Sequence, residues 1–214
     1  MQSFKEELAN SLTHGFGVLL GFIGVPILVS LAVFKGESQH VWAVSIYSVS
    51  LLMVYVVSTL YHSFQHPEVK RVLRVIDHIS IYFLIAGSYT PFILIYMDGM
   101  NGYAILALIW TIALAGTAFK ILFTGKFNLL STISYLGMGW MALFIGKPIF
   151  IGIPPEGLVW LVIGGAAYSL GVIFYLWQRL RYHHAIWHLF VLAGSISHYI
   201  AIFYSLHAGH WASL

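Results

Sequence analysis

The stretch His183-His184-Ala185-Ile186-Trp187-His188-Leu189-Phe190-Val191-Leu192-Ala193-Gly194-Ser195-Ile196-Ser197-His198 opens the last apolar run of the chain, which extends to about Leu206. As a helix this run crosses a bilayer, because about 20 apolar residues at ~1.5 Å each span the ~30 Å hydrocarbon layer. His184 and His188 are four residues apart and therefore share one helical face. Ionisable side chains inside a membrane are costly and usually mark a functional site. The spacing of these two histidines thus indicates a chelating pair.

Composition places the chain among integral membrane proteins. Of its 214 residues, 60% are hydrophobic and only 8% are charged, which is too few to cover a soluble globule. The formal net charge of +3 is too small and too scattered to indicate nucleic-acid binding. The absence of cysteine excludes disulfides, thiolate metal sites and cysteine nucleophiles. A metal would have to be held by imidazole and carboxylate, which favours zinc first and other divalent transition metals second.

Seven apolar segments predict an all-α polytopic membrane protein, with seven transmembrane helices in a single domain of residues 1–214. The segments cover roughly residues 14–34, 41–64, 74–97, 102–122, 129–147, 158–178 and 184–206. The proline-rich segment 147–156 is expected to be an outer loop that dips into the membrane interface. Short connections make consecutive helices antiparallel neighbours.

The basic residues predict the orientation of these helices. Eight of the ten fall on one side of the expected bundle: Lys5, Lys70, Arg71, Arg74, Lys120, Lys126, Arg179 and Arg181. Lys35 and Lys147 fall on the other side. Because cytoplasmic loops are enriched in lysine and arginine, the N-terminus is expected in the cytoplasm and the C-terminus outside.

Further polar residues fall at the same end of the bundle as His184 and His188. Ser58 and His62 are four residues apart at the end of the second segment, and Asp77 stands at the start of the third. Taken alone, His62 also fits an interfacial side chain, and Asp77 an acid that complements a helix dipole. Together, three imidazoles with a nearby acid match a catalytic zinc site with three protein ligands and water in the fourth position. Asp77 would then be either a fourth ligand or the group that holds the water.

A polar stripe precedes the first apolar segment. Glu7, Asn10, Ser11 and His14 follow the spacing i, i+3, i+4 and i+7, so they share one helical face. Two interpretations are open. The stripe is either the polar face of a short amphipathic helix in the membrane interface, or a second shell in which groups such as Glu7, Asn10 and His14 orient the metal ligands.

The constellation resembles the signature of the progestin and adipoQ receptor family, which matches Ser58-x-x-x-His62, Asp77 and His184-x-x-x-His188. The resemblance implies a zinc ion held by His62, His184 and His188, with Asp77 contacting it through water and Ser58 nearby. The wider superfamily includes alkaline ceramidases, which hydrolyse lipid amides at a similar site.

Two further segments are similar to the bacterial branch of that family, the haemolysin III or membrane-homeostasis proteins. These segments are Glu7-x-x-Asn10-Ser11-x-Thr13-His14 and Ala86-Gly87-Ser88-Tyr89-Thr90-Pro91. The resemblance covers essentially the whole chain. It implies a multi-pass protein of the bacterial inner (plasma) membrane, with a membrane lipid as substrate or ligand. The orientation predicted from the basic residues places the metal site near the cytoplasmic face.

Three functions follow from these expectations. The first is zinc-dependent hydrolysis of a lipid amide or ester, with Asp77 as general base and Ser58 donating a hydrogen bond to the developing oxyanion. The second is a non-enzymatic sensor or receptor-like regulator, in which zinc ties helices together. The third is membrane permeabilisation, which only the haemolysin name suggests. The first two connect the chain to homeostasis of membrane lipids, fluidity or energetics.

Overall fold

The computed structural model describes residues 2–35, 37–97 and 99–208. In these ranges the chain forms helices and no strand. The helices are α1 (Phe4–Phe34), α2 (Ser38–Ser63), α3 (Pro67–Tyr96), α4 (Gly99–Phe123), α5 (Asn128–Trp140), α6 (Ala142–Ile145), α7 (Lys147–Gly152), α8 (Pro155–Leu176) and α9 (His183–Ala208). Seven spans are long and apolar enough to cross a membrane, and α5 and α6 together form the fifth of them. The expected all-α, seven-span architecture is confirmed.

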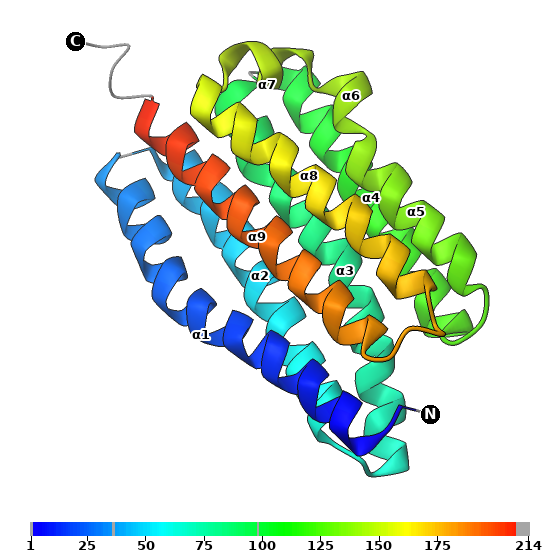
Figure 1. The fold of residues 1–214 in the computed structure, drawn as a ribbon. Helices are drawn as coiled ribbons and strands as arrows, with labels where there is room; N and C mark the ends of the chain where they lie inside the picture. The colour runs from blue at the N-terminus through cyan, green and yellow to red at the C-terminus, as the bar shows by residue number, and fades with distance from the viewer. Residues whose placement is uncertain (1, 36, 98, 209–214) are drawn as a thin grey trace.

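The spans pack side by side as one bundle (Figure 1). Helix α3 lies at its centre and contacts α2, α4, α5, α7 and α9. Accordingly, 67% of the apolar window of α3 is buried, against 17% for α4 and 22% for α1. The N-terminus, the turn from α2 to α3 and the start of α9 all lie at one end of the bundle (Figure 1). The polar residues of these three segments therefore meet at that end.

Helix α1 begins at Phe4, ten residues before the apolar segment expected from residue 14. A capping box starts it, since the Ser3 side chain accepts the Glu6 N–H and the Glu6 carboxylate accepts the Ser3 N–H. The polar stripe continues into the spanning helix, and Glu7, Asn10 and His14 are buried against protein. The stripe is therefore part of the bundle and not the polar face of a separate interfacial helix.

The fifth span is not one continuous helix, because it breaks at Met141 between α5 and α6. Tyr89 of α3 lies at the break. Its hydroxyl is 3.0 Å and 2.7 Å from the carbonyl oxygens of Met138 and Gly139, and it accepts the Ala142 N–H at 2.9 Å. One side chain thus satisfies backbone groups that the interruption leaves without helical partners. The expected outer loop at 147–156 is also different, since it contains the short helix α7.

Replacing Tyr89 with phenylalanine is expected to lower the free energy of unfolding by about 1–3 kcal/mol, because backbone groups at the break would be buried without a partner. Unfolding of the detergent-solubilised protein by heat or denaturant measures the change. Tyr103→Phe on α4 is the matched control, because Tyr103 is 52% exposed. Equal stability of the two variants would contradict the role given to the Tyr89 hydroxyl.

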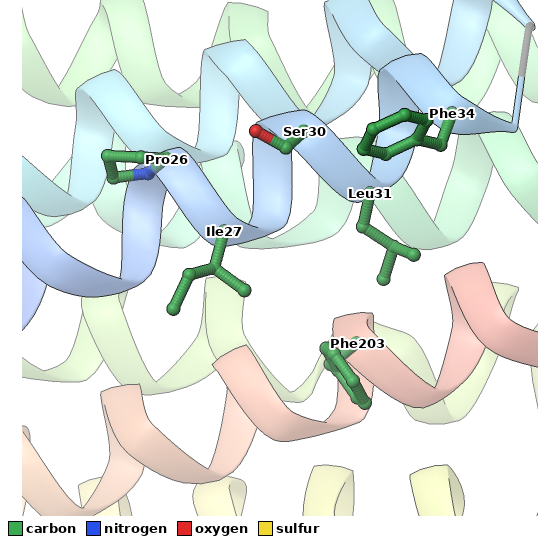
Figure 2. A pocket seen from close by; sticks show the side chains of 6 residues that line it. All are labelled: Pro26, Ile27, Ser30, Leu31, Phe34 and Phe203. Atoms are coloured by element: carbon green, nitrogen blue, oxygen red, sulfur yellow. The ribbon is translucent and has the colours of Figure 1, made fainter.

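A hollow of about 430 Å³ lies between α1 and α9, toward the other end of α1. Figure 2 shows the six side chains that line it: Pro26, Ile27, Ser30, Leu31, Phe34 and Phe203. None of these six side chains is ionisable. This hollow therefore carries no acid–base or metal chemistry, and the site must be sought among the polar residues at the opposite end of α1.

Candidate metal centre

Three histidines gather where α2 ends and α9 begins. His62 stands in the last turn of α2, and His184 and His188 stand one turn apart at the start of α9. One ring nitrogen from each lies within 4.8 Å of those of the other two. The ring centroids are 4.6 Å apart for His184 and His188, and 5.1 Å from His62 to each. The pair spaced for chelation on α9 thus meets a third imidazole from another helix.

The Nε2 atoms of these three histidines are buried and have no hydrogen-bond partner among the described residues. Buried polar atoms nearly always have a partner, so three unpaired nitrogens directed into one space need an explanation. Nitrogen lone pairs from three imidazoles are a donor set that suits zinc and neighbouring transition metals. The residues present therefore fit a metal ion held by His62, His184 and His188.

Helix α1 contacts the far side of two of these rings. The Glu7 carboxylate lies 2.7 Å from Nδ1 of His62, and the Asn10 carbonyl oxygen lies 3.2 Å from Nδ1 of His188. In each contact the Nδ1–H donates to an oxygen, which leaves the lone pair on Nε2 free for a metal. Thr13 Oγ1 is also 3.2 Å from Nδ1 of His188. Glu7 and Asn10 thereby fix the tautomer in which both Nε2 atoms can act as ligands.

His14 contacts the centre in a different way. Its ring stacks on that of His188 with centroids 3.5 Å apart and an interplanar angle of 13°, and the edge of Tyr55 covers it at 5.1 Å. Neither ring nitrogen of His14 has a hydrogen-bond partner in the described part of the chain. His14 is also not a member of the three-histidine group. It therefore supports His188 by packing and does not orient it through a hydrogen bond.

Asp77 and Ser58 lie near the helix ends that carry the three histidines. Both are buried, with 8% and 1% of their surface exposed, and Ser58 stands one turn before His62 on α2. The Ser58 hydroxyl is near the Asp77 carboxylate and has no hydrogen-bond partner at normal distance among the described residues. The Asp77 carboxylate does not belong to the group of close ligand atoms. Of the two roles left open by the sequence, this position favours a group that reaches the centre through water over a fourth ligand.

A family model described as "Haemolysin-III related" matches residues 2–199 of the chain. The chain belongs to the haemolysin III family. It is 44% identical over 207 residues to the hemolysin-3 homolog of Bacillus subtilis (strain 168), covering 95% of this chain and 96% of the relative. Hemolysin-3 of Bacillus cereus is 44% identical over 206 residues, with 96% and 94% covered.

The similarity of the chain extends to animal proteins. The human monocyte to macrophage differentiation factor is 31% identical over 203 residues, which cover 92% of this chain and 83% of that protein. No solved structure shows significant similarity to the chain. These matches confirm the resemblance to haemolysin III proteins and to the progestin and adipoQ receptor family. With the seven spans, they identify a multi-pass membrane protein.

Two residues of this haemolysin III family member join the centre although the sequence did not single them out for it. Lys70 pairs with the second oxygen of Glu7 at 2.9 Å, and Thr13 contacts His188. Lys70 lies in the first turns of α3, and its sequence position marks it only as one of the basic residues that predict orientation. No spacing rule relates it to Glu7, 63 residues earlier. Thr13 had a weak signal, since it stands three residues after Asn10 within the N-terminal motif.

Proposed function

We propose that the protein is a zinc-dependent hydrolase of membrane lipids, acting on an amide or ester bond. The observation that carries the proposal is the convergence of three histidines with unpaired, buried Nε2 atoms, together with the buried Ser58 one turn from His62 and the buried Asp77 carboxylate near Ser58. Three imidazole ligands are typical of catalytic zinc sites, which keep one position open for the reaction. When bound, zinc would polarise a carbonyl group and lower the pKa of water.

The residues around the metal would supply the other parts of the reaction. The Asp77 carboxylate would accept a proton from the attacking water and return it to the leaving amine or alcohol. The Ser58 hydroxyl, which lies near the Asp77 carboxylate, would donate to the carbonyl oxygen as negative charge develops on it. Glu7 and Asn10 would hold the rings of His62 and His188 in the orientation that directs their Nε2 atoms to the metal. A site at the end of a helix bundle suits a lipid whose scissile bond lies between its headgroup and its tails.

The test is release of fatty acid by the purified protein in lipid vesicles that contain either a ceramide-type amide or a phospholipid ester. We expect turnover of one class, loss of turnover after metal chelation, and recovery when zinc is returned. A monodisperse, zinc-loaded protein that releases no fatty acid from either class would overturn the enzymatic proposal.

A second function has specific support in the way that three helices meet at the centre. Glu7 and Asn10 of α1 bind histidines of α2 and α9, so a metal there would lock the relative positions of all three helices. This arrangement suits a regulator in which zinc controls helix movement. Zinc binding without lipid turnover, together with a fluidity phenotype that disappears when the metal site is removed, would favour this function over hydrolysis.

Replacing Glu7 with alanine is expected to weaken zinc binding about 10–100-fold, because an outer partner that fixes a metal-binding histidine typically contributes that much. Competition with a chelator of known affinity measures the change. Glu68→Ala on α3 is the control, because the Glu68 carboxylate is exposed and pairs only with Arg71 among the described residues. Unchanged zinc affinity in the Glu7 variant would contradict its orienting role.

A further inference from the structure

Lys120 is an unexplained charge at the end of the bundle that carries the metal centre. It stands three residues before the end of α4, and none of its surface is exposed. Its Nζ has no hydrogen-bond or ion-pair partner in the ranges that the structure describes. A buried ammonium group without a partner is strongly unfavourable. A negatively charged ligand at Lys120 would therefore stabilise a charge that the described part of the chain leaves unpaired.

The surroundings of Lys120 add positive charge. Arg74 and His78 are one turn apart on α3, and both are close enough to Lys120 for their charges to interact with it. The Arg74 guanidinium lies against the turn from α4 to α5, where a β-carbon on Gly125 would be 3.4 Å from Nη1. No ion pair involves Arg74 among the described residues. We call Lys120, Arg74 and His78 the basic cluster. The Asp77 carboxylate lies 4.0 Å from Nδ1 of His78, but no described acid pairs with Lys120 or Arg74.

This combination of side chains suits a phosphate group. A guanidinium offers a planar fork that matches phosphate oxygens, and a lysine ammonium adds a compact charge. Helix α5 begins directly after the same turn, and no side chain caps its first N–H groups. The N-terminus of a helix favours an anion because its N–H groups are free and its dipole is positive there.

An apolar groove lies one helical turn from Lys120. It lies between α3, α4 and α5, has a volume of about 220 Å³, and includes Tyr82, Gly116, Phe119 and Leu130 in its lining. Gly116 is one turn from Lys120 on the same face of α4, so the groove and the cluster adjoin. A polar anion site at the ends of spanning helices, with an apolar groove leading away from it, has the chemistry of a phospholipid.

We propose that the basic cluster binds the phosphate of an anionic membrane lipid, and that the groove between α3, α4 and α5 receives one of its acyl chains. A lipid phosphate and a free phosphate ion would present the same group to the basic cluster. The groove favours the lipid, because an inorganic ion has no part that would occupy it. The site uses none of the three histidines, although His78 adjoins Asp77, and it does not rest on the proposed hydrolysis.

The test compares the full-length wild type with Lys120→Met and Arg74→Gln in nanodiscs of phosphatidylcholine, with and without phosphatidylglycerol. Native mass spectrometry measures the lipid that stays bound after release from the nanodisc. We expect preferential retention of phosphatidylglycerol by the wild type and about tenfold weaker retention in both variants, since charge-assisted hydrogen bonds contribute on this scale. Arg71→Gln is the matched control, because Arg71 is a basic residue of the same turn region of α3 whose side chain is 78% exposed.

Each outcome of this test decides the proposal. Equal retention of the two lipids by the wild type would overturn it, and so would an equal loss in Arg71→Gln, which would indicate only a diffuse positive surface.

A second experiment replaces the lipid with inorganic phosphate. If it alone raises the thermal midpoint of the wild type but not of Lys120→Met, and phosphatidylglycerol is not retained, the anion is free phosphate and the lipid is excluded. Lys120→Met should fold well because it removes an unpaired buried charge, and Arg74→Gln tests the same site independently.

Discussion

Replacing His188 with alanine is expected to reduce the bound metal from about one ion per chain to almost none. His188 is fully buried, supplies one of three converging Nε2 atoms, and is the ring that Asn10 and His14 hold in place. Losing a ligand should weaken binding by more than the 10–100-fold that loss of an outer partner causes. Elemental analysis of the purified variant measures the effect.

The control for this variant is His198→Ala. His198 is a second histidine of α9 whose two ring nitrogens are buried, and it lies ten residues further along the helix, away from the three-histidine group. Its loss removes an imidazole of the same kind without removing a ligand. Retention of the metal by His188→Ala, or an equal loss from His198→Ala, would contradict the assignment of the site.

Replacing Asp77 with asparagine is expected to lower turnover of the lipid substrate by about 10²–10⁴-fold, the range that a general base contributes. The amide keeps the shape of the buried side chain but cannot accept the proton of the attacking water. Bound metal should stay near the wild-type level, because the Asp77 carboxylate is not among the close ligand atoms. Fatty acid release and metal content are measured on the same preparation.

Glu68→Gln serves as the control for Asp77, since it neutralises an exposed acid on the same helix. If Asp77→Asn turned over lipid at the wild-type rate, the mechanism would be wrong even with the metal in place. If it lost metal as well as activity, Asp77 would be a ligand, and the position described for it beside the centre would need revision.

Much of this fold could be predicted from the sequence because lipid leaves so few choices. Apolar runs of spanning length must be helices, and seven such runs gave the seven spans with ends shifted by several residues. The spacing of His184 and His188 follows from helix geometry alone, so the pairing on α9 was visible in the sequence. His62 joined them by an argument about depth, because short connections bring neighbouring helix ends to one level.

Features that depend on contacts between distant segments could not be predicted in this way. The break at Met141 has no proline or glycine at the residue itself, and Tyr89 of another helix satisfies the backbone groups there. The pairing of Lys70 with Glu7 joins α3 to α1 and follows no local spacing. Lys120 looked like an ordinary basic residue near a helix end, and only packing shows that it is buried without a partner.

Orientation in the membrane stays a prediction. The structure shows that the N-terminal end of α1, the three histidines and the basic cluster share one end of the bundle, and this is the end where most basic residues fall. Which side of the membrane this end faces follows only from that charge distribution. Residues 209–214 at the C-terminus, which are expected to lie outside the cell, are beyond the described ranges.

The central claim is that His62, His184 and His188 hold a zinc ion, and metal content of the wild-type protein tests it most directly. The protein would be purified in detergent without added metal, checked for monodispersity, and analysed for all first-row transition metals. The account predicts about one zinc ion per chain. Well-folded, monodisperse protein that contains no metal and takes up none when zinc is supplied would contradict it.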